Sequence, residues 1–151
     1  MRSSSNKNKG FGNTCEENHK GNSPKFNNEL NQEQKALEFI KEGKFQEAEE
    51  IYKQLVDLGT KNHEIYGNLA ALYGMKGHKN EMYKLLKKAI EIEPNFPEAH
   101  NNLGTFYRKK GDLEKATLYF NKAIQLNPNF SDPYYNLGNT FREKGNILSS
   151  I

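Results

Sequence analysis

The sequence predicts an all-α fold built from repeated helix pairs, and three observations support this prediction. Glycine recurs at intervals of 34 residues, at Gly43, Gly77, Gly111 and Gly145. The chain has 14 Leu, eight Ile and eight Ala but a single Val and no Trp, which disfavours strands. Between the glycines, small and large apolar residues recur at helical spacing. We therefore expect a solenoid of three full helix–turn–helix units and a fourth, truncated unit.

Alignment on the glycines divides the chain into units 29–62, 63–96, 97–130 and 131–151. The third unit shows the pattern most clearly. Leu103, Gly104 and Tyr107 fall on one face of a first helix, where the small Gly104 lets a neighbouring helix approach. Gly111 ends that helix, because glycine readily takes a positive φ. A second helix with its own inward face follows, and a proline closes the unit: Ala116, Phe120, Ala123 and Pro128.

Applied to each unit in order, this pattern predicts seven helices, at residues 31–42, 45–58, 63–76, 79–92, 97–110, 113–126 and 131–144. The fourth unit reaches only Ile151, a few residues past Gly145. We expect its first helix to pack on the third unit and to leave its other face open. Self-association through this open end is one interpretation, and a fragment of a longer protein is another.

These residues resemble the tetratricopeptide repeat (TPR) family over residues 29–151. The second and fourth units carry the same signature, at Tyr66, Leu69, Ala70, Tyr73, Gly77, Leu86, Ala89 and Pro94, and at Tyr134, Leu137, Gly138, Phe141 and Gly145. The first unit is degenerate, with Lys35 where Leu is usual and Thr60 where Pro is usual. The resemblance implies a right-handed α-solenoid in which the first helices line a concave groove and the first unit acts as a polar cap.

The resemblance also implies that the position before the signature leucine points into the groove. That position holds Asn68, Asn102 and Asn136, and Asn139 follows one turn later. An asparagine amide can both donate to and accept from a peptide main chain. The series is similar to the asparagine ladder of the TPR domain in O-linked N-acetylglucosamine transferases. The alternative, that asparagine is simply common at this position in bacterial TPR sequences, stays open.

A second type of groove is not expected from these positions. Chaperone-binding TPR domains, which the chain resembles in fold, clamp a dicarboxylate with Lys, Asn and Arg, and of these only Asn68 matches. The first unit offers Glu33 and Leu37, and the third offers Glu98 and Asn102. Two further residues at equivalent places, Arg108 and Arg142, would suit an acidic partner.

Residues 1–28 differ in composition from the rest of the chain. They are rich in Asn, Ser and Gly and carry the whole net charge of +3, so we expect a disordered tail. The neutral remainder offers no basic face, which argues against a nucleic-acid partner. The cluster of Cys15, Glu16, Glu17 and His19 lacks the paired spacing of a metal site.

The sequence contains no catalytic motif, and we expect neither a cofactor nor a metal. His100 is interpreted as a packing substitute for an aromatic ring. No stretch approaches the length of a membrane span, and no signal peptide is apparent, so we expect a cytoplasmic protein with no membrane partner. The favoured function is a non-catalytic adaptor or scaffold that binds a protein or peptide partner in the groove. The alternative is that the chain is the N-terminal fragment of a larger bacterial transferase, a sulfotransferase or glycosyltransferase, and recruits its partners.

Overall fold

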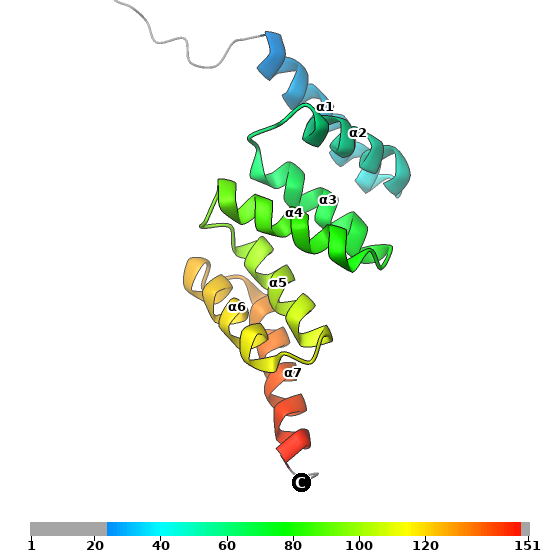
Figure 1. The fold of residues 1–151 in the computed structure, drawn as a ribbon. Helices are drawn as coiled ribbons and strands as arrows, with labels where there is room; N and C mark the ends of the chain where they lie inside the picture. Colours follow the sequence, from blue (N-terminus) through cyan, green and yellow to red (C-terminus); the bar gives the residue numbers. More distant parts are fainter. Residues whose placement is uncertain (1–23, 149–151) are drawn as a thin grey trace, which may run out of the picture.

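The computed structural model of the chain describes residues 24–148, and it is all-α throughout them (Figure 1). Seven helices follow one another: α1 (Pro24–Lys41), α2 (Phe45–Asp57), α3 (His63–Met75), α4 (Lys79–Ile92), α5 (Pro97–Lys109), α6 (Leu113–Leu126) and α7 (Ser131–Leu148). Each helix packs on the next one along the chain, and α5 also contacts α3 and α7. The predicted helical repeat solenoid is therefore confirmed.

The turns inside the first three units form where the glycine spacing predicts them. Gly43, Gly77 and Gly111 have φ of 75°, 80° and 82°, a conformation that other residues adopt at a cost. In the second unit, for example, the amide of His78 donates to the carbonyl of Tyr73 just across the turn. Helices α2 to α6 accordingly begin at the predicted residues and end within one residue of the predicted ends.

The first helix is longer than predicted. It begins at Pro24 rather than near residue 31, so residues 24–28 are helical and not part of the expected tail. A proline costs a helix no hydrogen bond at its first position, which allows the helix to extend beyond the part that packs. The remainder of the expected tail, including the Cys15 to His19 cluster, lies outside the described residues.

The last helix also differs from the prediction, because Gly145 does not end it. Helix α7 runs from Ser131 to Leu148 without a turn, and Gly145 is not among the glycines of positive φ. In the first three units a second helix packs back on the first and so stabilises the turn. No such helix follows Gly145 among the described residues, and the helical hydrogen bonds simply continue.

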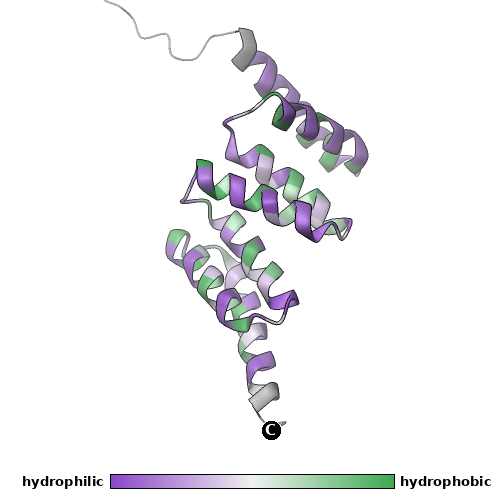
Figure 2. Ribbon diagram, viewed as in Figure 1, coloured by the Kyte–Doolittle hydropathy of each residue, from purple (hydrophilic) through white to green (hydrophobic). Residues whose placement is uncertain are grey.

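Two apolar clusters hold the successive helices together. The first joins α1, α2 and α3 through Ala36, Ala48, Ile51, Tyr52, Leu55, Ile65, Leu69 and Leu72. The second joins α3, α4 and α5 through Tyr66, Ala70, Leu86, Ala89, Ala99 and Leu103. Hydrophobic and hydrophilic positions alternate along the helices, as Figure 2 shows, so each helix can face two neighbours and solvent.

A repeated hydrogen bond links the start of α3, α5 and α7 to the connection before each helix. Tyr66 and Tyr134 donate their hydroxyls to the carbonyls of Thr60 and Pro128, at 3.2 and 3.1 Å. At the equivalent position, His100 Nε2 lies 2.9 Å from the carbonyl oxygen of Pro94, and the residue is only 7% exposed. Because a carbonyl only accepts, Nε2 carries the proton. His100 thus takes the place of a tyrosine in the packing.

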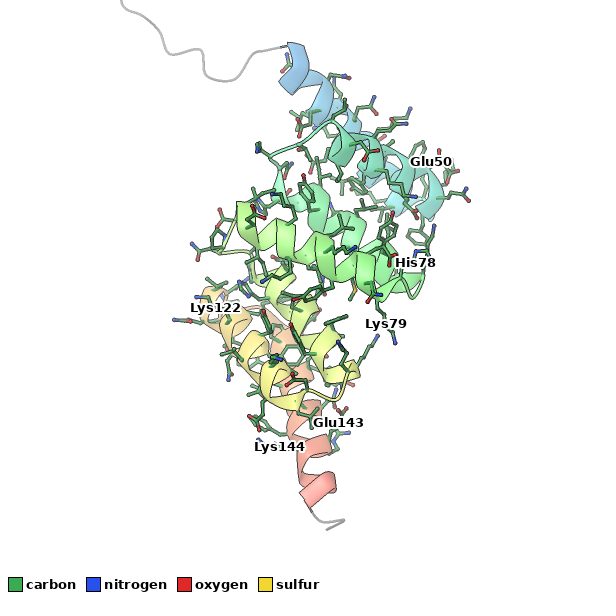
Figure 3. All side chains as sticks on the ribbon, viewed as in Figure 1. Glu50, His78, Lys79, Lys122, Glu143 and Lys144 are labelled. Atoms are coloured by element: carbon green, nitrogen blue, oxygen red, sulfur yellow. The ribbon has the colours of Figure 1, made fainter. Side chains whose placement is uncertain are left out.

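Helix α7 is covered on one side only. Pro133 and Thr140 are buried against α5 and α6, whereas Tyr134, Tyr135 and Phe141 are exposed. Two ion pairs attach its C-terminal half: Arg108 to Glu143 at 2.9 Å, and Lys144 to Glu114. Figure 3 shows Glu143 and Lys144 together where α7 passes the preceding helices. No helix within residues 24–148 is both long and apolar enough to cross a bilayer.

Candidate peptide-binding groove

An open cavity of about 660 Å³ lies along the first helices of the first three units, and we call it the groove. It is lined by α1, α3, α5 and the α4–α5 connection, through Leu37, His63, Glu64, Gly67, Asn68, Ala71, Asn95, Phe96, Pro97, Glu98, Ala99 and Asn102. Gly67 shapes this surface, because a Cβ there would lie 2.8 Å from the ring of Phe96. The glycine therefore lets Phe96 pack directly on α3.

The groove combines an apolar surface with polar side chains. Leu37, Phe96 and Pro97 supply large apolar groups, and the edge of the His63 ring meets the Phe96 ring with centroids 4.7 Å apart. This contact holds the Phe96 ring in place from the side. Amide and carboxylate side chains stand among these groups, which is the usual composition of a ligand site.

The structure brings two of the predicted asparagines into the groove. Asn68 and Asn102, one unit apart on α3 and α5, are both half-buried and both line the cavity. Asn68 Nδ2 donates to the hydroxyl of Tyr52 at 3.3 Å, which leaves its carbonyl oxygen and its second N–H. Within residues 24–148 the Asn102 amide has no side-chain hydrogen bond, so all its donors and its acceptor are available.

The other two asparagines lie on α7 and do not line the groove. Asn136 Nδ2 donates to Oδ1 of Asn101 at 3.1 Å, and Asn101 itself is only 6% exposed. Asn139 Oδ1 accepts from Arg142 at 2.8 Å. These two side chains were predicted to face a ligand, whereas in the structure each forms a hydrogen bond with another residue of the chain. Their part in binding stays a prediction.

The two arginines are likewise outside the groove. Arg108 Nη1 donates to Glu143, and its Nε is buried with no hydrogen-bond partner among the described residues. Arg142 is exposed on α7. Glu143 therefore neutralises Arg108, whereas Arg142 bonds only to the neutral amide of Asn139 and keeps its positive charge.

Two carboxylates that line the groove are absent from the site residues predicted from the sequence. Glu64 and Glu98 lie in the first turns of α3 and α5, and both line the cavity. Asp132 occupies the same place in α7. The signal that could have identified them was present, since these acids recur with the 34-residue spacing of the glycines. Of these three acids only Glu98 enters the sequence analysis, where it stands in place of a basic residue of a dicarboxylate clamp.

A third carboxylate is buried near the α1 end of the groove. Glu33 is 6% exposed and accepts a hydrogen bond from Asn62 Nδ2 at 2.8 Å. Burial raises the pKa of Glu33, and the negative charges of Glu64 and Glu29 raise it further. Three carboxylates, those of Glu29, Glu33 and Glu64, therefore lie near one another at this end. In the described part of the chain, no group of three or more His, Cys, Asp or Glu residues is placed to hold a metal ion.

Similar solved structures share this architecture. MamA has 27% identity and a TM-score of 0.70, with 79% of this chain and 70% of that chain covered. The first TPR domain of Spaghetti (RPAP3), solved with the HSP90 peptide SRMEEVD, has 20% identity and a TM-score of 0.71 over 78% and 93%. The Sgt2 TPR domain from Aspergillus fumigatus has 18% identity and a TM-score of 0.71 over 84% and 83%.

Models of the tetratricopeptide repeat match residues 63–96, 97–130 and 119–151. No curated protein matches the chain. The matched segments include all of the second and third units, and the helix pairs in them have the predicted turns and packing. On this sequence and structural evidence, the chain belongs to the tetratricopeptide repeat family.

Proposed function

We propose that this protein is a non-catalytic protein-interaction module that holds an extended peptide or a partner helix in the groove between α1, α3 and α5. One observation carries the proposal: two asparagine amides, Asn68 and Asn102, stand one unit apart beside the apolar surface of Leu37, Phe96 and Pro97. A peptide can bury an apolar side chain on that surface while its main chain bonds to the amides.

The two amides suit a main chain because they do not select a sequence. An extended peptide presents alternating N–H and C=O groups, and an asparagine can bond to either. Asn102 has no competing partner within the described residues, and Asn68 keeps its acceptor free while it bonds to Tyr52. We expect each amide to contribute roughly 0.5 to 1.5 kcal/mol to binding.

Two further points support a binding role without catalysis. The RPAP3 domain, which shares the fold, was solved with a short peptide, and this makes a peptide a reasonable occupant here. His100, the most buried histidine of residues 24–148, is hydrogen-bonded to a main-chain carbonyl and packs near the ring of Tyr119. That environment suits a packing role rather than proton transfer to a substrate.

The test uses peptides selected on the full chain from a random display library, with affinities measured by fluorescence anisotropy. Replacement of Asn68 and Asn102 by alanine should weaken binding by about 1 to 3 kcal/mol if the two effects add. The single Asn102→Ala variant separates binding from folding, because within residues 24–148 this amide has no side-chain hydrogen bond to lose.

The matched control is Asn80→Ala with Asn121→Ala, two exposed asparagines on the second helices α4 and α6. We expect the control to bind like the unmodified protein, and the control and Asn102→Ala to have similar thermal melts, whereas Asn68→Ala also loses the hydrogen bond to Tyr52. If the groove variant and the control bind the selected peptides equally well, recognition lies on another surface and the proposal is wrong.

A further inference from the structure

Building on the proposed function, we propose that the groove takes a basic partner: an extended segment whose Lys or Arg side chains meet the carboxylates of Glu64 and Glu98 while an apolar side chain lies against Phe96. The residues that line the groove include these two carboxylates and no Lys or Arg. Charge complementarity therefore favours a cationic segment over a neutral or acidic one.

The two carboxylates are available to a partner. Both side chains are exposed, and within residues 24–148 neither Glu64 nor Glu98 takes part in an ion pair. Other acids of the fold are used internally. Glu49, for instance, is paired with Lys53 and Lys76, and Glu143 with Arg108.

The negative character extends along the groove towards α1. Glu33 is buried behind this end, and its raised pKa reports the nearby charges of Glu64 and Glu29 in addition to burial. The pKa of Tyr52, which bonds to Asn68, is raised to about 12 by burial and by the charge of Glu33. Glu29 and Glu33 therefore add carboxylates beside the α1 end of the groove, although they do not line it.

The basic residues of the fold do not cancel this charge inside the groove. Three lysines of α4, Lys84, Lys87 and Lys88, line a different cavity with Tyr83, Ile90 and Glu91. That cavity shares no residue with the groove.

Helix stability offers a competing reason for these acids. A carboxylate in the first turn of a helix interacts favourably with the helix dipole, whatever it faces. Glu47 and Glu81 lie in the first turns of α2 and α4, and neither is among the residues that line the groove. They therefore provide a control that has the same dipole effect and no place in the binding surface.

The experiment compares three pools of labelled synthetic peptides with the full chain by fluorescence anisotropy. All pools share a central leucine in an otherwise small polar sequence. The positions that flank the leucine are Lys or Arg in the basic pool, Ser or Thr in the neutral pool, and Asp or Glu in the acidic pool. We expect the basic pool to bind most tightly and the acidic pool most weakly.

Replacement of Glu64 and Glu98 by glutamine should weaken binding of the basic pool about fivefold and leave the neutral pool unchanged, because exposed ion pairs are individually weak. Added salt should reduce the preference for the basic pool in the unmodified protein. The control Glu47→Gln with Glu81→Gln should retain the preference, with a thermal stability close to that of the groove variant.

Two results would overturn the inference and leave the proposed function standing, provided that binding is still weakened by Asn68→Ala and Asn102→Ala. One is that the neutral or acidic pool binds most tightly. The other is that the preference for the basic pool is unchanged after the glutamine substitutions. Insensitivity of every pool to the asparagine substitutions would overturn the proposed function itself.

The chain also has a basic segment of its own: residues 1–23 contain Arg2, Lys7, Lys9 and Lys20 against Glu16 and Glu17. Tighter binding of a synthetic peptide of residues 1–23 than of the basic pool would assign the groove to this segment instead of a separate partner.

Discussion

At the scale of single residues, the same hydrogen bond is made by different side chains in successive units. Tyr66 and Tyr134 reach a carbonyl six residues earlier, and His100 makes the equivalent bond to Pro94. The remaining ring nitrogen of His100, Nδ1, is buried with no hydrogen-bond partner among residues 24–148. A proton there would lack an acceptor, and burial lowers the pKa of His100 from its usual 6.5.

The first prediction follows from this environment. The unfolded chain binds more protons than the folded one between pH 6.5 and the lower folded pKa, so stability should fall as the pH drops through 6.5. His100→Tyr should keep the bond to Pro94 and remove this loss, whereas His100→Ala should cost about 2 to 4 kcal/mol at pH 7.5 and less at pH 5.5, because the unmodified protein is itself less stable there. Urea unfolding at pH 5.5 and pH 7.5 measures both. An equal pH dependence in the Tyr variant and the unmodified protein would contradict the prediction.

At the scale of helices, Gly104 and Gly138 occupy the same position in successive units but meet different surroundings. A Cβ at Gly104 would lie 2.6 Å from the ring of Phe120 on α6, the second helix of its unit. A Cβ at Gly138 would meet no atom within 4 Å, because no second helix packs on that face of α7 among the described residues. The equivalent position in the second unit is Ala70, which is fully buried.

The second prediction uses this pair of glycines. Gly104→Ala should destabilise the protein by about 1 to 3 kcal/mol, since the Phe120 ring must move in a packed interior. Gly138→Ala should stabilise α7 by about 0.5 to 1 kcal/mol, because alanine loses less backbone freedom in a helix. Thermal unfolding of the two variants gives the comparison. Destabilisation by both would indicate that the open face of α7 is covered in solution.

At the scale of the whole molecule, the array has no long-range core. Each helix packs mainly on its neighbours along the chain, so stability is roughly a sum over units and their interfaces. Helices α3 to α6 have packed helices on both sides, whereas α7 is covered by α5 and α6 on one side only. The stability of the array should therefore decrease towards α7.

The third prediction is a gradient of hydrogen exchange. Amides of residues 131–148 should exchange faster than those of 97–126, because opening α7 disrupts one interface and two ion pairs instead of a buried core. Hydrogen-exchange mass spectrometry over dilutions of the full chain measures this. Uniform protection that disappears on dilution would support self-association through α7 and contradict the gradient in the monomer.

The repeat and most helix limits follow from local signals in the amino-acid sequence. A glycine that takes a positive φ ends the first helix of each of the first three units, small and large apolar residues alternate within them, and a proline closes the second and third units. They were sufficient for α2 to α6, where every turn has a following helix to stabilise it. They did not suffice for Gly145, because a glycine permits a turn but does not require one.

The partners of the polar side chains, in contrast, depend on how the helices pack against one another. Asn68, Asn102 and Asn136 are equivalent in sequence, yet the first two line the groove and the third bonds to Asn101 on the neighbouring helix. Arg108 is neutralised by Glu143, and the carboxylates of Glu64 and Glu98 remain unpaired in the described chain. The physical reason is that a repeat pattern specifies the face on which a side chain lies, whereas its partner depends on which residue the next helix places across from it.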